Sequence, residues 1–205
     1  MFSPKGMELD RGWPGRLEGD RVIQLAAQTL QVWFTAGGAL REHAEYALAD
    51  VELRAPVLHP PGIRLFDDDG GFVFGNTAAV FGPDADVPYP DDAPELRTGP
   101  AVAAVIGADG AIGGFTGANA WTAPGLPGAK AYDFALSLGP ALVTTDEYNG
   151  DGGWEGRVAA AARNTVLRPG ELLVVRTGSG ASAARGEAVE VDLGDLGVLR
   201  NSVAS

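Results

Sequence analysis

The hydrophobic pattern in the second half of the chain predicts a fold built mainly from β-strands. Residues 101 to 106 form a continuous apolar run, which is typical of a strand buried on both faces. Residues 189 to 193 instead alternate apolar and acidic side chains, as a strand with one solvated face does. Further apolar runs predict strands at residues 72 to 74, 79 to 81 and 172 to 175. We therefore expect a mostly β or α+β fold.

Residues 1 to 55 are expected to form a small N-terminal subdomain with mixed structure. A Gly-Asp turn predicts a hairpin over residues 15 to 25. The spacing of apolar residues predicts a helix within residues 26 to 34, and a short turn of helix is expected over residues 40 to 46. Residues 51 to 54 alternate like a strand and close this part of the chain.

Residues 56 to 205 are expected to form one larger domain without internal repeats. Residues 83 to 98 are rich in proline and acidic side chains, which predicts a solvated loop. An Asp-Gly turn leads into a strand predicted over residues 112 to 116. The alanine-rich stretch from residue 154 to 164 predicts a helix between two strands.

Charge and composition narrow the classes of function. Acidic residues outnumber basic residues by 27 to 15, giving a formal net charge of −12 that disfavours nucleic acid and anionic membranes as partners. No apolar run reaches the roughly 18 residues of a membrane-spanning helix. The N-terminus does not resemble a secretory signal, and without cysteine there are no disulfides or thiolate sites. We expect a cytoplasmic protein.

Several short motifs follow one another in a definite order. They are VIG at residues 105 to 107, GFTGANAW at 114 to 121, KAYDFALSLGPALVT at 130 to 144, LRPGELL at 167 to 173, TGSG at 177 to 180, GEAVEVD at 186 to 192 and LGVLRNSV at 196 to 203. In this order and spacing they resemble the sequence signature of the fumarylacetoacetate hydrolase (FAH) family. The likeness covers about residues 55 to 203, and residues 15 to 55 look like the small N-terminal domain that many members carry.

The resemblance implies an FAH-like mixed β-roll that usually dimerises and binds Mg²⁺, Mn²⁺ or Ca²⁺ together with a small oxo-acid. Family chemistry comprises hydrolysis of carbon–carbon bonds, decarboxylation and keto–enol isomerisation. In the family pattern, two glutamates lie two residues apart on one strand and therefore point to the same face. With an aspartate from the next strand they form an all-oxygen site that suits a hard divalent cation, which polarises the oxo group of the substrate.

The positions that the resemblance assigns to these metal ligands carry no side-chain oxygen. Aligned through residues 105 to 107, the two glutamate positions fall on Gly99 and Ala101. Aligned through residues 114 to 121, the aspartate position falls on Ala120. The histidine and glutamate of the family's lid are missing as well. These departures indicate a lost metal site and no metal cofactor. The alternative is that the alignment is displaced and other carboxylates bind a metal.

Four other residues are candidates for binding a ligand or moving a proton. Lys130 falls on the family's ligand-binding lysine and Thr177 on the threonine of its Gly-Thr-Pro loop; together they suit a carboxylate without a metal. Asn119 is a third candidate ligand-binding residue, and Asp133 is a candidate proton carrier beside Lys130. The alternatives are that Lys130 only forms an ion pair with Asp133 and that the Thr177 hydroxyl only satisfies its own loop.

Three hypotheses for function follow from these residues and the resemblance. The first is a family protein without its metal site, which binds a small oxo-acid-like ligand or serves as the non-catalytic partner of an active subunit. The second is a metal-free enzyme that isomerises, decarboxylates or cyclises an enolisable oxo compound through Lys130 and Asp133. The third is a metal-dependent carbon–carbon bond hydrolase with displaced ligands. In each case we expect a homodimer, or a heterodimer with a family member.

Overall fold

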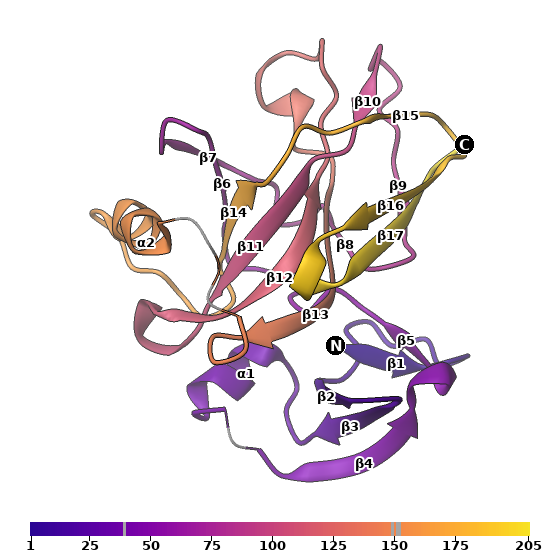
Figure 1. The fold of residues 1–205 in the computed structure, drawn as a ribbon, viewed down its shortest axis with the longest axis vertical. Helices are drawn as coiled ribbons and strands as arrows, with labels where there is room; N and C mark the ends of the chain where they lie inside the picture. Colours follow the sequence, from indigo (N-terminus) through magenta and orange to yellow (C-terminus); the bar gives the residue numbers. More distant parts are fainter. Residues whose placement is uncertain (39, 149, 151–152) are drawn as a thin grey trace.

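The structure is a computed structural model that describes residues 1–38, 40–148, 150 and 153–205. Its centre is a curled seven-stranded sheet in which antiparallel neighbours predominate, with parallel pairs where β6 meets β14 and β8 meets β13 (Figure 1). In spatial order the strands are β7 (Phe72–Phe74), β6 (Ile63–Phe66), β14 (Leu172–Arg176), β11 (Pro100–Ile106), β12 (Ile112–Ala120), β13 (Leu136–Thr144) and β8 (Val80–Phe81). The predicted mostly β, mixed architecture is confirmed.

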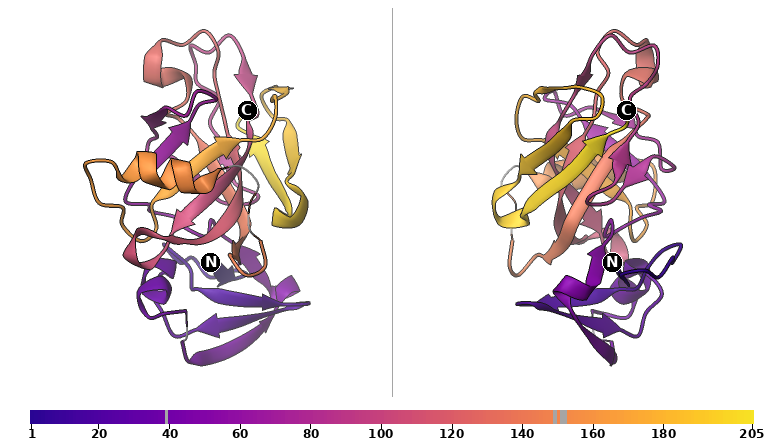
Figure 2. Two further views of the ribbon diagram at one scale, coloured as in Figure 1. Left: turned by 60° about the vertical axis from the view of Figure 1, so that its left-hand side comes forward. Right: turned by 90° about the vertical axis from the view of Figure 1, so that its right-hand side faces the viewer.

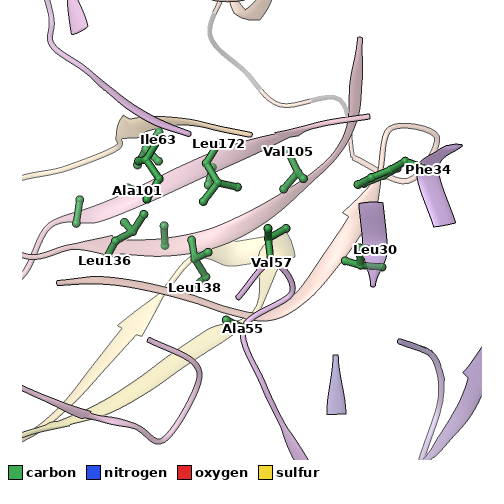
Figure 3. Packing of buried hydrophobic residues seen from close by; sticks show 14 residues of the cluster. Leu30, Phe34, Ala55, Val57, Ile63, Ala101, Val105, Leu136, Leu138 and Leu172 are labelled. Atoms are coloured by element: carbon green, nitrogen blue, oxygen red, sulfur yellow. The ribbon is translucent and has the colours of Figure 1, made fainter. Parts of the chain in front are cut away.

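The core covers both faces of this sheet, because the side chains of β11 alternate between two buried clusters. Ala101 and Val105 pack on one face with Leu138 and Leu172 (Figure 3). The intervening side chains of β11 pack on the other face, where α2 (Trp154–Ala162) lies against the sheet (Figure 1). The apolar run that predicted a strand buried on both faces was therefore interpreted correctly, and so was the alanine-rich helix.

A buried ion pair fastens β6 to its neighbour β14. The guanidinium of Arg64 contacts the carboxylate of Glu171, and both side chains are more than nine-tenths buried. Glu171 also accepts a hydrogen bond from the backbone N–H of Arg168 at 3.2 Å. Because a buried charge is costly without a partner, this pair fixes the place where β14 begins.

The N-terminal elements gather at one end of the molecule, below the large sheet (Figure 2). They are β1 (Phe2–Pro4) paired with β5 (Val51–Leu53), the three-stranded sheet of β2 (Gly15–Glu18), β3 (Arg21–Leu25) and β4 (Glu42–Ala47), the helix α1 (Leu30–Thr35) and the 3₁₀ turn η1 (Leu48–Asp50). The expected hairpin is present. The division of the chain at residues 55 and 56 stays a prediction.

Two expectations for the N-terminal part need correction. The helix begins only at Leu30, because the hydroxyl of Thr29 caps it by accepting a hydrogen bond from the backbone N–H of Val32 at 3.3 Å. The turn of helix expected over residues 40 to 46 is wrong, since β4 occupies most of it. Along β4 the half-buried residues Ala44 and Tyr46 are two apart, which is the period of a strand.

The loop expected over residues 83 to 98 is not wholly solvated. It holds the two-residue strands β9 (Asp86–Val87) and β10 (Leu96–Arg97), and the side chains of Val87 and Leu96 are completely buried. Their partners come from the end of the chain: β10 pairs with β15 (Ser182–Ala183) and β9 with β17 (Val198–Val203). On its other side β17 pairs with β16 (Ala188–Asp192). The remaining short elements are η2 (Ala108–Gly110), η3 (Gly128–Ala131) and η4 (Gly194–Leu196).

Within the described residues, no helix is both long and apolar enough to cross a membrane.

Candidate functional site

The three positions assigned to metal ligands come together at one end of β11 and β12. Gly99 directly precedes β11, and its carbonyl oxygen accepts a hydrogen bond at 2.8 Å from the backbone N–H of Ala120, the last residue of β12. Ala101 is opposite Ala118 in the same strand pair. Ala101, Ala118 and Ala120 belong to one buried cluster, so they share a face of the sheet. Two separately aligned motifs thus lead to one place in the fold.

This place does not fit a divalent metal ion. A Cβ atom on Gly99 would lie 2.2 Å from the carbonyl oxygen of Ala120, a separation that real Cβ atoms do not show, so the backbone leaves no room for a side chain there. Ala101 and Ala120 offer only methyl groups. Throughout the described part of the chain, no group of three or more His, Cys, Asp or Glu side chains could hold a metal ion. Hard cations need several oxygen ligands, which these residues do not supply.

A guanidinium lies against the same position. Arg176 is the last residue of β14 and is opposite Ala101 in the neighbouring strand. Its Nη2 atom donates a hydrogen bond to the carbonyl oxygen of Ala120 at 3.2 Å, and its Nε atom would lie 3.1 Å from a Cβ on Gly99. Partial burial lowers the pKa of Arg176 and the charge of Asp68 opposes that shift, but the group stays cationic. The site thus holds a positive charge provided by the chain itself.

Among the described residues, no carboxylate oxygen lies within 4.0 Å of the Arg176 guanidinium. Since a guanidinium carries five N–H donors and one donor position is used on Ala120, donors remain for an anion. Sequence reasoning missed this residue. The available signal was its position directly before Thr177, where the Gly-Thr-Pro pattern of the resemblance has a glycine.

The loop that follows Arg176 is held at both ends. The backbone N–H of Thr177 donates to the carbonyl oxygen of Pro100 at 2.9 Å. At the other end, Ala181 exchanges two 2.9 Å hydrogen bonds with Thr98, one between backbone groups and one from its N–H to the Thr98 hydroxyl. Between these points Thr177 and Gly178 are exposed, and a Cβ on Gly178 would meet no heavy atom within 4 Å. The loop is therefore anchored but open to solvent beside the guanidinium.

Lys130 and Asp133 form an ion pair with each other. Lys130 Nζ lies 2.7 Å from Asp133 Oδ2, and the exposed fractions of the two side chains are 71% and 21%. Asp133 also lines a small cavity of about 10 Å³ together with Tyr132 and Ala120. A cavity of this size holds about one water molecule. The structure thus places Asp133 near the candidate site, while the Lys130 ammonium is turned largely to solvent.

Asn119 is completely buried within β12 and acts on the backbone of the site. Its Oδ1 atom accepts a hydrogen bond from the backbone N–H of Gly99 at 2.6 Å, and its Nδ2 atom has no hydrogen-bond partner among the described residues. This contact holds Gly99 against the end of β12. The acidic cluster at residues 67 to 69 is a turn, in which Asp67 exchanges backbone hydrogen bonds with Gly70 and Gly71.

Comparison with solved structures identifies the architecture. No protein-family model and no curated protein matches the sequence. The maleylpyruvate hydrolase from a Sphingobium species has a TM-score of 0.76 at 20% identity, covering 95% of this chain and 97% of that one. A 2-keto-3-deoxy-D-arabinonate dehydratase has a TM-score of 0.79 at 14% identity, covering 99% and 97%. The 5-carboxymethyl-2-hydroxymuconate delta-isomerase from Mycobacterium smegmatis has a TM-score of 0.72 at 20% identity, covering 94% of both chains.

The chain has the fumarylacetoacetate hydrolase fold. Its neighbours with this fold are a hydrolase, an isomerase and a dehydratase, so the fold supports several reactions and does not select one. Structures of two neighbours contain metals and ligands, manganese(II) with pyruvate in the hydrolase and magnesium with 2,5-dioxopentanoate in the dehydratase.

In this example of the FAH fold, a larger cavity of about 620 Å³ lies elsewhere, between the N-terminal elements and β13. Its walls are mainly apolar and include Leu17, Leu30 and Trp33 from the N-terminal part and Pro140 and Leu142 from β13. None of the candidate residues lines it. The candidate site and this cavity are therefore separate features of the molecule.

Proposed function

We propose that this chain is an FAH-fold protein without the divalent-metal site and that it binds a small oxo-acid-like ligand in the absence of a metal. The observation that carries the proposal is the contact between Gly99 and Ala120, whose backbone atoms fill the space that metal-binding side chains need. Such a protein acts as a ligand-binding protein or as the non-catalytic partner of an active subunit.

The ligand class is supported by the neighbours and by the charge of the site. Solved neighbours with the same fold contain pyruvate or 2,5-dioxopentanoate, which are both small oxo compounds. The site presents a guanidinium in a chain whose net charge is −12, so a local positive charge is set in an acidic molecule. A small anion is attracted by that local charge, whereas a large polyanion also meets the negative surface around it.

A metal-free enzyme is the second candidate, and the pair formed by Lys130 and Asp133 favours it. The carboxylate of Asp133 is four-fifths buried beside the cavity at Ala120 and is hydrogen-bonded to the Lys130 ammonium. A carboxylate in such a position is a suitable base for removing a proton next to an oxo group. Turnover of an enolisable oxo acid by the wild type that is lost in Asp133→Asn would favour this candidate over simple binding.

Calorimetry with Mg²⁺ and Mn²⁺ on chelator-treated protein tests the proposal. We expect no saturable metal binding up to millimolar concentrations, because no described cluster supplies the oxygen ligands. We also expect the heat of pyruvate binding to be the same with and without a chelator. Tight binding of one metal ion per chain would contradict the proposal and restore the hypothesis of a metal-dependent hydrolase with displaced ligands.

A further inference from the structure

We propose that the guanidinium of Arg176 is the ligand anchor of this site, a fixed positive charge that binds the carboxylate of a small 2-oxo acid directly. This inference rests on the proposed function and names the group that performs it. The neighbours with the same fold have a metal ion in their complexes, whereas this chain presents a side-chain cation at the end of β14.

The position of the guanidinium is fixed by the strands around it. Arg176, the last residue of β14, is paired with Ala101 near the start of β11, and its Nη2 atom donates a hydrogen bond to the carbonyl oxygen of Ala120. Gly99 gives the side chain its space, since the Nε atom lies where a larger residue would collide. A cation held by three strands needs little reordering when a ligand binds, which favours binding.

The chemistry of the site favours a carboxylate over other groups. A planar guanidinium matches the two oxygens of a carboxylate with two parallel N–H donors. In the described part of the chain no acidic side chain forms an ion pair with Arg176, and the charge of Asp68 acts on it only from beyond 4.0 Å. Seven other arginine and lysine side chains of the described residues form ion pairs, as Arg97 does with Glu95. Other cations of the described residues, such as Arg41 and Arg168, also form no ion pair, so Arg176 is distinguished by its place, since its guanidinium lies against Gly99 and Ala120 with no carboxylate beside it.

The surroundings favour a compact ligand. The enclosed cavity beside Ala120 has room for about one water molecule, so the ligand lies on the open side of the guanidinium. On that side the exposed residues Thr177 and Gly178 leave free space. The loop that contains them is anchored at Pro100 and at Thr98. A two- or three-carbon oxo acid reaches the guanidinium there without moving the backbone.

The test uses pyruvate as the probe and calorimetry or saturation-transfer NMR as the readout, with a chelator present throughout. The variants are Arg176→Gln, which removes the charge, and Arg176→Lys, which keeps the charge but not the planar donor pair. Arg21→Gln is the matched control, because it removes an arginine that is also exposed but is paired with Glu45 in the N-terminal sheet. Pyruvamide, which lacks the carboxylate charge, is the control on the ligand side.

We expect Arg176→Gln to weaken pyruvate binding at least about tenfold, Arg176→Lys to weaken it less, and Arg21→Gln to leave it unchanged. Wild-type protein is expected to bind pyruvamide at least about tenfold more weakly than pyruvate.

If wild type binds both probes equally, or if Arg176→Gln and Arg176→Lys bind pyruvate like wild type, the inference is wrong while the proposed function stands. If wild type binds no pyruvate in chelator but binds it with Mn²⁺, the proposed function fails as well. The pyruvamide comparison needs no variant, so the inference is tested even if the substitutions unfold the chain.

Discussion

Gly99 illustrates how a single residue determines the chemistry of this site, because the missing side chain allows two backbones to meet. The carbonyl oxygen of Ala120 lies 2.2 Å from the place where a Cβ would be, and the amide of Asn119 holds the Gly99 N–H from the same strand. The usual expectation for a glycine at a strand end is conformational freedom. Here the reason for glycine is close approach, and its φ is not in the left-handed region.

We expect Gly99→Ala to lower the free energy of unfolding by about 1–3 kcal/mol, because the added methyl group must displace Ala120 or the Arg176 guanidinium. Urea denaturation followed by circular dichroism measures the change. The matched control is Gly178→Ala, where the new Cβ meets open space and the expected change is below about 1 kcal/mol. Equal effects of the two substitutions would show that the close contact at Gly99 is not present in solution.

Only part of the candidate site could be predicted from the sequence. The residues that were predicted lie close together along the chain, and the residue that was missed lies far from them. Gly99 directly precedes β11 and Ala120 ends β12, and one short turn joins these two strands. Aligning each residue with a motif was therefore enough to bring them together. Arg176 comes from a strand more than 50 residues further along, and no local pattern marks its direction. Tertiary packing determines which distant side chain lies against Gly99 and Ala120, and a single sequence does not display that packing.

At the scale of elements, the loop beside Arg176 depends on the two-residue strands β10 and β15. Glu95, directly before β10, links one side chain from each strand. Its carboxylate accepts hydrogen bonds from the Ser182 hydroxyl of β15 at 2.6 Å and from Arg97 Nε of β10 at 2.8 Å. These bonds lower the pKa of Glu95 below its ordinary value of 4.5, with the Ser182 hydroxyl as the largest cause and Arg97 next. The bonds thus favour the ionised carboxylate, which joins the two strands.

We expect Glu95 to stabilise the fold at neutral pH and to lose that contribution in acid. Because its folded-state pKa is lowered, the contribution is complete above about pH 4.5 and disappears as the pH falls through the folded value. The difference in urea midpoint between wild type and Glu95→Gln should therefore shrink between about pH 7 and pH 3. Glu8→Gln, an exposed residue without a hydrogen bond among the described residues, is the control. A difference that does not change with pH would contradict the role of the carboxylate.

The elements that the sequence predicted well are those with a long, one-sided or continuous apolar pattern, such as β11 and α2. Those that it missed have weak local signals. β9 and β10 contain two residues each in a proline-rich stretch and become strands only because distant segments pair with them. β4 was read as helix because its few apolar residues fit either period, and pairing with β3 decides the outcome.

At the scale of the whole molecule, α1 connects the N-terminal elements to the large sheet. Leu30 and Phe34 belong to the same buried cluster as Val105 and Val57, although they precede residue 55 (Figure 3). The ring of Phe34 is so close to Gly113 that a Cβ there would lie 2.3 Å from its Cε1 atom. A helix that shares the core of the sheet couples the two parts of the chain energetically. We therefore expect residues 1 to 55 and 56 to 205 to unfold as one cooperative unit.

Phe34→Ala should destabilise the entire molecule by about 3–5 kcal/mol, since it empties a well-packed site between α1 and the sheet. Val32→Ala on the same helix is the matched control; the Val32 side chain is 44% exposed, and the expected change is below about 1 kcal/mol.

Urea unfolding followed in parallel by tryptophan fluorescence and far-ultraviolet circular dichroism distinguishes cooperative from independent unfolding of the two parts. Trp13 and Trp33 report on the N-terminal part, whereas Trp121 and Trp154 report on the larger part. Single-tryptophan variants with coincident transitions would support one cooperative unit. If Phe34→Ala shifts only the signals of Trp13 and Trp33, the N-terminal part unfolds independently and α1 does not couple the two parts.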